Sequence, residues 1–487
     1  MFNFPVVINL LSLLIGISGA AMLLALPFSF AFGDGTEYAI LTAGLCSIVL
    51  GGIGWFLTRN RPNKELKKRD GYIVVTLGWL VMSAVGALPY VLSGAIPSYT
   101  DAFFETMSGF TTTGASILGD QIEALPKSLH FWRAMTHWIG GMGIIVLTIA
   151  ILPLLGIGGM QLYAAEVPGP TPDKLTPRIQ ETAKRLWIIY VSLTALQLIF
   201  LMLGGMSFFE SACHAMATLS TGGFSTRQNS VGDFSPYIQY VVTIFMFIAG
   251  INFALTYQVI RGKPLKLWRN EEFRVYTFLT LGLISLVTLI VYFRAEGLAF
   301  EQAFRDAAFE VLAIITTTGF GTADYTQWGS FLMVLFFILM FSGACAGSTS
   351  GGMKLVRFIV LFKNSYTELK RQIYPKAILP VRFNGKAIHT NIVSRILSFF
   401  IVFIILFVGG VFVISSMGFD FETSMGAVAA TLGNIGPGLG QVGPGDAQNF
   451  ARIPMEGKWF LSFLMLLGRL ELFTVLMLFS PFFWRDN

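Results

Sequence analysis

The stretch FETMSGFTTTGAS, residues 104–116, places three threonines and a glycine inside an otherwise apolar chain. A second copy, FEVLAIITTTGFG, occupies residues 309–321, and in both copies the glycine lies nine residues after the glutamate. Two more divergent copies are FFESACHAMATLSTGGFST at 208–226 and FETSMGAVAATLGNIGPGLG at 421–440. Four related segments at intervals of roughly one hundred residues indicate an internal repeat that organises most of the chain.

The composition is that of an integral membrane protein. Of the 487 residues, 54% are hydrophobic and 12% charged, whereas a soluble domain is roughly 25% charged. A bilayer core of about 30 Å requires about 20 apolar residues per helix. The sequence therefore predicts an all-α fold with ten transmembrane helices, within 1–33, 38–58, 71–100, 134–165, 186–209, 234–260, 275–293, 325–353, 396–419 and 459–484.

The basic residues are concentrated in alternate connections between these spans. The connections 59–70, 172–185, 261–274 and 354–395, together with Arg485, hold 25 of the 33 lysines and arginines. Because basic residues in short loops stay on the cytoplasmic side, both termini are expected in the cytoplasm. Topology and contact with anionic membrane lipids explain the net charge of +6, so no nucleic-acid partner is expected.

The polar side chains do not form a catalytic or metal-binding set. The three cysteines lie inside apolar segments without metal-ligand spacing, and the four histidines are too scattered for a multi-haem subunit. No P-loop or Rossmann fingerprint is present. The chain is therefore not expected to be an enzyme or to carry a covalent cofactor, and any nucleotide control must come through a partner subunit.

The repeated unit consists of a span, an apolar stretch of about ten residues, a Thr/Gly segment and a second span. The short stretch is interpreted as a re-entrant half-helix, and the irregular backbone after it must be buried or line a water-filled cavity. Four such units with one orientation predict a pseudo-four-fold arrangement around a single pore. The predicted units are an N-terminal helix pair with its loop at 1–70 and pore repeats at 71–160, 161–265, 266–375 and 376–487.

The Thr/Gly segments predict a selectivity filter that binds a cation through backbone carbonyls. In each segment a β-branched residue precedes a glycine, which lets successive carbonyls turn toward one axis. The half-helices also direct their partly negative carboxyl ends toward the pore. Aligned on the glycines, with Gly436 preferred to Gly433 because Ile435 precedes it, the expected filter residues are Thr111, Thr112, Thr113 and Gly114; Ser220, Thr221 and Gly222; Thr316, Thr317, Thr318 and Gly319; and Asn434, Ile435 and Gly436.

The Phe-Glu pairs are less regular than the glycines. Their glutamates precede the aligned glycine by nine residues in two segments but by twelve and fourteen in the others. Glu105, Glu210, Glu310 and Glu422 are interpreted as caps of the half-helices, with loop anchoring or attraction of cations at the mouth as alternatives. They are not expected to be ion ligands.

Four repeats of span, half-helix, Thr-x-Gly-like loop and span, after an extra helix pair, resemble the Trk/Ktr/HKT superfamily of potassium transporters over the whole chain. The resemblance implies potassium uptake across a bacterial inner membrane, a homodimer, and a cytoplasmic nucleotide-binding subunit of the TrkA type. All four aligned positions are glycine in this chain. Plant relatives that have a serine at the first of these positions transport sodium. Potassium is therefore favoured, although the segments lack the Thr-Val-Gly-Tyr-Gly run of tetrameric potassium channels.

Two features predict a gate below the filter. Arg469 lies in the middle of the last apolar span, where a charge must face a water-filled path or a partner. The resemblance implies an electrostatic barrier there, and a salt bridge between helices is the alternative. The run GACAGSTSGG at 343–352 is poor helix material and predicts an unwound loop beneath the filter, with close helix packing as the alternative. The resemblance implies that this loop is a gate. Its named candidates are Gly343, Gly347, Ser348, Thr349, Gly351 and Gly352.

One rival function remains. A secondary cation transporter coupled to sodium or protons also uses broken helices, but it predicts two inverted halves rather than four repeats of one orientation. The basic connection 354–395 is the expected docking surface for the cytoplasmic subunit.

Overall fold

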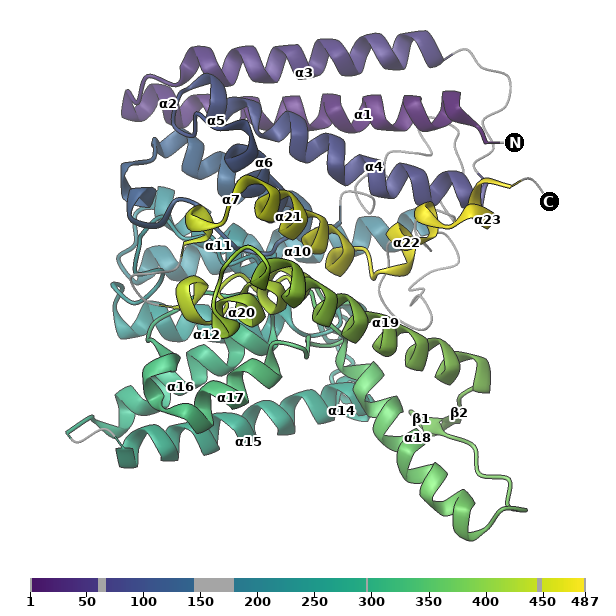
Figure 1. Ribbon diagram of the computed structural model, residues 1–487. Coiled ribbons are helices and arrows are strands. Elements are labelled where there is room, and N and C mark those ends of the chain that lie inside the picture. Colours follow the sequence, from purple (N-terminus) through teal and green to yellow (C-terminus); the bar gives the residue numbers. More distant parts are fainter. Residues whose placement is uncertain (1, 60–66, 144–178, 295–296, 445–448, 486–487) are drawn as a thin grey trace.

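A computed structural model describes residues 2–59, 67–143, 179–294, 297–444 and 449–485. Within these ranges the chain is helical except for one two-stranded hairpin and the connecting loops (Figure 1). Six helices are long and apolar enough to cross a membrane, or up to eight if each of two bent helix pairs counts as one span. The prediction of an all-helical, multi-span membrane protein is thereby confirmed.

The chain begins with an antiparallel helix pair, and the later elements follow one order four times. The pair consists of α1 (Phe4–Leu23), α2 (Leu26–Phe32) and α3 (Glu37–Thr58). The first unit contains α4 (Lys68–Gly86), α5 (Leu88–Leu92), α6 (Tyr99–Phe110), η1 (Gly119–Ala124) and α7 (Lys127–Gly141). The second contains α10 (Ile179–Leu203), α11 (Phe208–Leu219), α12 (Pro236–Ala249), α13 (Phe253–Ile260) and α14 (Leu265–Arg269).

The third and fourth units have the same plan. The third contains α15 (Glu271–Arg294), α16 (Phe300–Ile315), η3 (Tyr325–Trp328), α17 (Ser330–Leu339) and α18 (Leu355–Ile373). The hairpin β1 (Arg382–Phe383) and β2 (Lys386–Ala387) connects it to the fourth. The fourth contains α19 (Thr390–Ser415), α20 (Phe421–Leu432), η4 (Gly440–Val442), η5 (Phe450–Arg452), α21 (Met455–Arg469), α22 (Phe473–Leu476), η6 (Met477–Phe479) and α23 (Pro481–Trp484).

The short helices α6, α11, α16 and α20 are the expected half-helices. Three of them have 12 residues, about 18 Å, which is too short to cross a bilayer. Side chains of Ser98, Ser207 and Asp420 cap the amino ends of α6, α11 and α20. The carboxyl halves are buried in the protein, so the irregular chain that follows each helix is not exposed to lipid.

Two spans that were predicted to be continuous are bent. In 234–260, α12 and α13 meet at 104°, because the chain turns at Gly250 and the side chain of Asn252 then caps a new helix at Ala254 and Leu255. In 459–484, α21 and α22 meet at 112°, with Glu471 and Leu472 in left-handed conformations (φ 56° and 57°). Hydropathy reports burial and not helix direction, so the sequence predicted both spans as straight.

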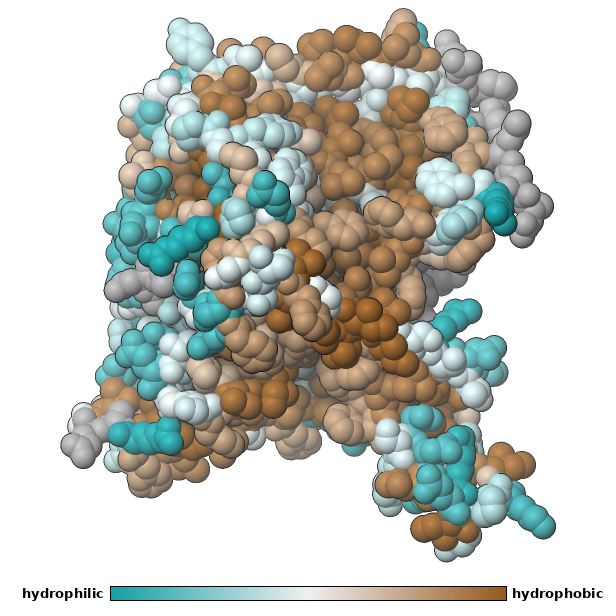
Figure 2. All heavy atoms as spheres, in the orientation of Figure 1, coloured by the Kyte–Doolittle hydropathy of each residue, from teal (hydrophilic) through white to brown (hydrophobic). Residues whose placement is uncertain are grey.

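The remaining predicted spans can be compared only in part. Within 325–353 the helix α17 is short, and the small-residue run after it is a loop, as predicted. Residues 144–165 of the span 134–165, residues 172–178 of the connection 172–185 and residues 60–66 of the connection 59–70 lie outside the described residues. Both termini lie at the same end of the molecule, from which α18 and the hairpin also project (Figure 1). An apolar band separates the polar ends (Figure 2).

Glycines set the close crossing of α1 and α3. A side chain at Gly51 would collide with the backbone of Ser12 and Gly16, and one at Gly19 with the carbonyl of Gly44. Small residues of this kind allow helix backbones to approach in a membrane.

Replacing Gly51 by leucine is expected to lower the apparent Tm in detergent by several degrees, since overpacking costs about 1–3 kcal/mol. Gly52→Leu is the matched control, because a side chain there meets no atom within 4 Å. Equal Tm values for the two variants would contradict the tight crossing.

Candidate functional site

Each half-helix ends in the same hydrogen-bonded turn. In α6, the amide of Thr112 donates to the carbonyl of Gly109 at 3.0 Å, and that of Thr113 to Ser108 at 2.9 Å. This pair of bonds defines a Schellman motif, which normally places a glycine in the left-handed position. Here that position is held by three threonines and an asparagine, with φ of 52°, 56°, 56° and 53°: Thr112, Thr221, Thr317 and Asn434. A β-branched residue rarely adopts this conformation, so the turns are strained and must be held by their surroundings.

A left-handed glycine follows two residues later in every segment. These glycines have φ of 83°, 81°, 71° and 103°: Gly114, Gly223, Gly319 and Gly436. The expected choice of Gly436 over Gly433 agrees with this geometry, because Gly433 is the right-handed C-cap of α20. In the second segment the alignment on Gly222 was wrong by one residue. Gly223 has the left-handed conformation, and Gly222 occupies the place of Thr113, so a β-branched residue does not precede the glycine in all four segments.

The four segments form a closed ring. A Cβ atom on any of the four left-handed glycines would lie under 3.0 Å from a carbonyl oxygen of the next segment. Gly114 faces the carbonyl of Gly222, Gly223 that of Thr318, Gly319 that of Ile435, and Gly436 that of Thr113. The order runs from the first segment to the fourth and returns to the first. Four glycines therefore pack against four backbone carbonyls around one axis, and no side chain fits at the glycine positions.

The ring borders an open vestibule. All four left-handed glycines line it, together with residues that follow them such as Ser116 and Pro437. Arg133, Arg227 and Asp120 also contribute to its wall.

Several hydroxyls of the four segments form hydrogen bonds inside their own segment. Thr111 Oγ1 donates to the carbonyl of Met107 at 2.6 Å and lies 2.8 Å from Thr113 Oγ1. Thr316 and Thr318 repeat this hydroxyl pair at 2.7 Å. In the second segment Ser220 Oγ donates to the carbonyl of Met216 at 2.7 Å. These hydroxyls are therefore already bonded within their segments.

The predicted gating loop lies directly below the segments. The amide of Gly351 donates to Thr317 Oγ1 at 2.6 Å, and Thr349 Oγ1 donates to the carbonyl of Leu219 at 3.0 Å. A Cβ on Gly351 would collide with Asn434. Ser348 and Thr349 are buried. The loop thus contacts three of the four turns.

Side chains beyond the loop hold it in place, and the sequence analysis missed them. Glu272, at the start of α15, accepts from the amides of Ala346 and Val356 at 2.8 and 3.0 Å. The Lys354 ammonium donates to the carbonyl of Ser350, four residues earlier. Lys354 borders the uncharged run in the sequence, but Glu272 lies 74 residues before Ala346, and nothing in the sequence shows that either side chain turns toward the run.

Arg469 connects the Thr/Gly segments to the loop at 343–352. Its guanidinium donates to Thr112 Oγ1 at 3.0 Å and to the carbonyl of Thr349 at 2.9 Å. It also donates to the carbonyls of Gly140 and Gly141, where α7 ends, at 2.5 and 3.1 Å. Its charge therefore lies on the side of the turns opposite the vestibule. Glu471 forms its ion pair with Arg357 of α18.

The four glutamates of the Phe-Glu pairs have different roles. Glu105 accepts from Ser116 Oγ and the amide of Ile117, both at 3.0 Å, and Glu310 accepts from the amide of Thr322 at 2.7 Å. These two anchor the chain that follows Gly114 and Gly319.

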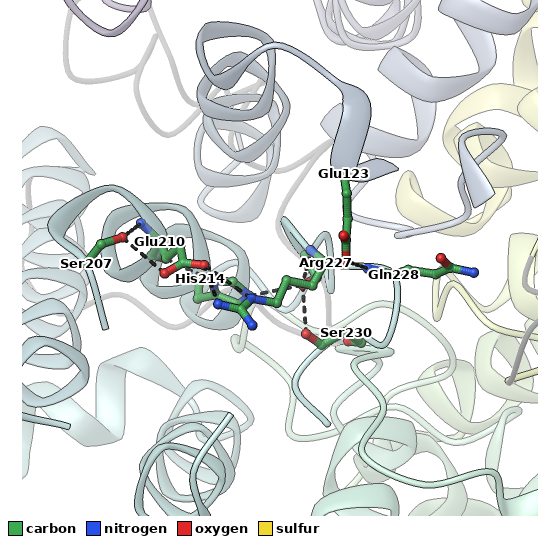
Figure 3. Close-up of polar contacts among 8 residues, drawn as sticks. Glu123, Ser207, Glu210, His214, Arg227, Gln228 and Ser230 are labelled. Carbon is green, nitrogen blue, oxygen red and sulfur yellow. Dashed lines mark hydrogen bonds and ion pairs between the residues drawn. The ribbon is translucent and has the colours of Figure 1, made fainter. Parts of the chain in front are cut away.

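Glu210 lies at the amino end of α11, next to its cap. There it pairs with Arg227 at 2.9 Å, while the backbone amide of the next residue, Gln228, donates to Glu123 Oε1 of the first unit at 3.4 Å (Figure 3). The position in α11 that corresponds to Glu105, counted back from the helix end, is His214, which contacts Ser225 Oγ at 3.1 Å. Glu422 lies in the first turn of α20.

Comparison with known proteins places these features in one family. The family model described as "TrkH: Cation transport protein" matches residues 36–486. The Trk system potassium uptake protein TrkH of Escherichia coli K12 is 40% identical over 488 residues, covering 99% of this chain and all of the relative. TrkG of the same strain is 35% identical and covers 99% of both chains. The crystal structure of the potassium transporter TrkH from Vibrio parahaemolyticus matches with a TM-score of 0.89 and 37% identity, covering 99% of this chain and all of that one.

Proposed function

Because the chain belongs to the TrkH family of cation transport proteins, and is not an enzyme, we propose that it takes up potassium across a bacterial inner membrane. The observation that carries the proposal is the closed ring in which four left-handed glycines face four backbone carbonyls. Carbonyl oxygens can replace the hydration shell of a potassium ion. The printed names of the relatives favour potassium as the ion.

The ring is proposed to be the selectivity filter of a pseudo-four-fold pore. Its contributors are the predicted segments, with Gly223 added to Ser220, Thr221 and Gly222 in the second. The proposed units are those predicted from the sequence: an N-terminal pair at 1–70 and pore repeats ending near 160, 265, 375 and 487. The carboxyl ends of α6, α11, α16 and α20 point at the ring, and their partial negative charge favours a cation.

Arg469 and the loop at 343–352 are proposed to form the gate below this filter. A fixed positive charge that contacts Thr112 raises the energy of a cation leaving the filter. The loop closes the same path, because Thr349 contacts both Arg469 and the carbonyl of Leu219. Opening requires the loop and the guanidinium to move together.

The regulatory partner is proposed to dock at the end of the molecule where both chain termini lie. There α18 continues directly from the gating loop and projects from the molecule with the hairpin (Figure 1). We place this end in the cytoplasm, since it carries the basic connection 354–395. The relatives' designation as Trk system proteins supports a TrkA-like nucleotide-binding subunit, and a homodimer is proposed as the membrane unit.

The test is uptake of radioactive rubidium into liposomes that contain the purified protein, with sodium or potassium as competitor. Rubidium uptake that potassium inhibits much more strongly than sodium is expected. Absence of rubidium uptake, with or without the cytoplasmic subunit, would contradict the proposal. A strict requirement for a sodium or proton gradient would favour the coupled transporter instead.

Deletion of 346–349 is expected to raise rubidium uptake in the absence of the cytoplasmic subunit to the level seen with it. The deletion removes the contacts of Thr349 with Arg469 and with the second filter segment. Deletion of the same number of residues at 375–378, in the exposed connection before the hairpin, is the control. A monodisperse variant with unchanged low uptake would show that the loop is not the gate.

A further inference from the structure

The chain leaving the first filter segment and the chain leaving the second are tied together by one side chain. Arg133, from α7, contacts Ser225, which follows Gly223, and Glu105, whose carboxylate binds the two residues Ser116 and Ile117 that follow Gly114. We infer that Arg133 is a positioning residue that fixes the spacing of these two segments and thereby sets the selectivity for potassium over sodium. The inference rests on the proposed function.

On the first segment Arg133 acts through Glu105. Its Nε donates to Glu105 Oε1 at 2.6 Å. The same carboxylate accepts from Ser116 Oγ and the amide of Ile117, both at 3.0 Å. These residues lie two and three positions after Gly114. The ion pair therefore fixes the backbone at the outer end of the first segment.

On the second segment Arg133 acts on the backbone directly. One terminal nitrogen donates to the carbonyl of Ser225 at 2.9 Å. The guanidinium also lies 3.5 Å from the centre of the Phe224 ring, which stacks on His137 at 3.9 Å. Phe224 immediately follows Gly223, and His137 occupies the space that a side chain on Gly222 would need.

The position and the burial of the Arg133–Glu105 ion pair link it to ion selectivity. Arg133 and Glu105 are 2% and 0% exposed, so both charges depend on each other for compensation. The two segments that they fix are neighbours in the ring, where Gly114 faces the carbonyl of Gly222. A shift between them changes the distance between opposing carbonyls, which distinguishes potassium from the smaller sodium ion.

The other two segments are held in different ways. In the third, Glu310 accepts directly from the amides of Thr322 and Ala323. In the fourth, the chain after the filter packs against α20 at Gly426, where a side chain would collide with the backbone of Leu439. The guanidinium bridge is therefore specific to the junction of the first and second segments among the described residues.

The test compares Arg133→Lys with the wild type in rubidium and sodium uptake into liposomes. Lysine keeps the charge but lacks the planar fork needed to reach Glu105, Ser225 and the Phe224 ring together. The ratio of rubidium to sodium uptake is expected to fall about tenfold, the factor that corresponds to one charge-assisted hydrogen bond. Arg305→Lys, which alters the exposed pair with Glu301 on α16, is the matched control and is expected to keep the wild-type ratio.

A double variant, Glu105→Gln with Arg133→Gln, removes both charges and avoids an unpaired buried one. The double variant is expected to lower the ratio of rubidium to sodium uptake as well. Its Tm in potassium is also expected to exceed its Tm in sodium by less than in the wild type. Wild-type values of the ratio in Arg133→Lys, or of the potassium-dependent Tm rise in the double variant, would overturn the inference. A wild-type protein without rubidium uptake would instead overturn the proposed function.

Discussion

Replacing Gly319 by alanine is expected to reduce rubidium uptake by about 100-fold or more. The new methyl group would collide with the carbonyl of Ile435 and with the ring of Pro437. The left-handed φ of 71° at this position is also unfavourable for an alanine. Together the two effects cost about 3 kcal/mol, which corresponds to about 100-fold. Because the carbonyl of Ile435 belongs to the ring, the collision disturbs the proposed filter itself.

Uptake into liposomes measures this effect, with Gly282→Ala as the control. Gly282 lies inside α15, and a side chain there meets no atom within 4 Å. The control is expected to transport like the wild type. Normal, potassium-selective uptake by Gly319→Ala would show that this glycine does not line the ion path.

Replacing Arg469 by alanine is expected to raise rubidium uptake about tenfold or more. Two unit charges about 6 Å apart repel by about 3 kcal/mol at an effective dielectric constant of 20. The substitution also removes the bonds that connect Thr112 to the loop carbonyl of Thr349. Both changes lower the barrier below the filter.

The variant Arg469→Lys separates the effect of the positive charge from that of the hydrogen bonds, because lysine keeps the charge but lacks the guanidinium that bonds Thr112 and Thr349. If repulsion is the main barrier, the lysine variant keeps uptake low, whereas release of the loop would raise it. Arg395→Ala, which removes an exposed charge from α19, is the control for net charge. Unchanged or lower uptake in a monodisperse Arg469→Ala variant would exclude the barrier.

Composition and the repeated glycines were sufficient to predict the class of fold and the segments that meet in the ring. The number of long apolar runs predicts how many segments cross a bilayer. A backbone position that requires a positive φ is usually a glycine, so it can be recognised in the sequence. The second segment was misaligned because Gly222 and Gly223 are adjacent. Sequence does not say which of two neighbouring glycines has the left-handed conformation, whereas the turn after Thr221 selects Gly223.

The polar contacts around the ring could not be predicted, because they join residues far apart in the sequence. Glu105 and Glu210 were both interpreted as caps of their half-helices. The position equivalent to Glu105 in α11 is instead His214, and the partner of Glu105 is Arg133, 28 residues away. Likewise Glu272 reaches the gating loop across 74 residues. Such contacts depend on how the units pack around the axis, which no local pattern encodes.

The most direct test of the filter is anomalous diffraction from crystals of the protein grown in rubidium. An anomalous peak is expected on the axis of the ring, within coordination distance of the carbonyl oxygens of Thr113, Gly222, Thr318 and Ile435, and an excess of potassium should remove it. Ordered rubidium elsewhere in the molecule, with none at this ring, would contradict the assignment of the four segments as the ion-binding filter.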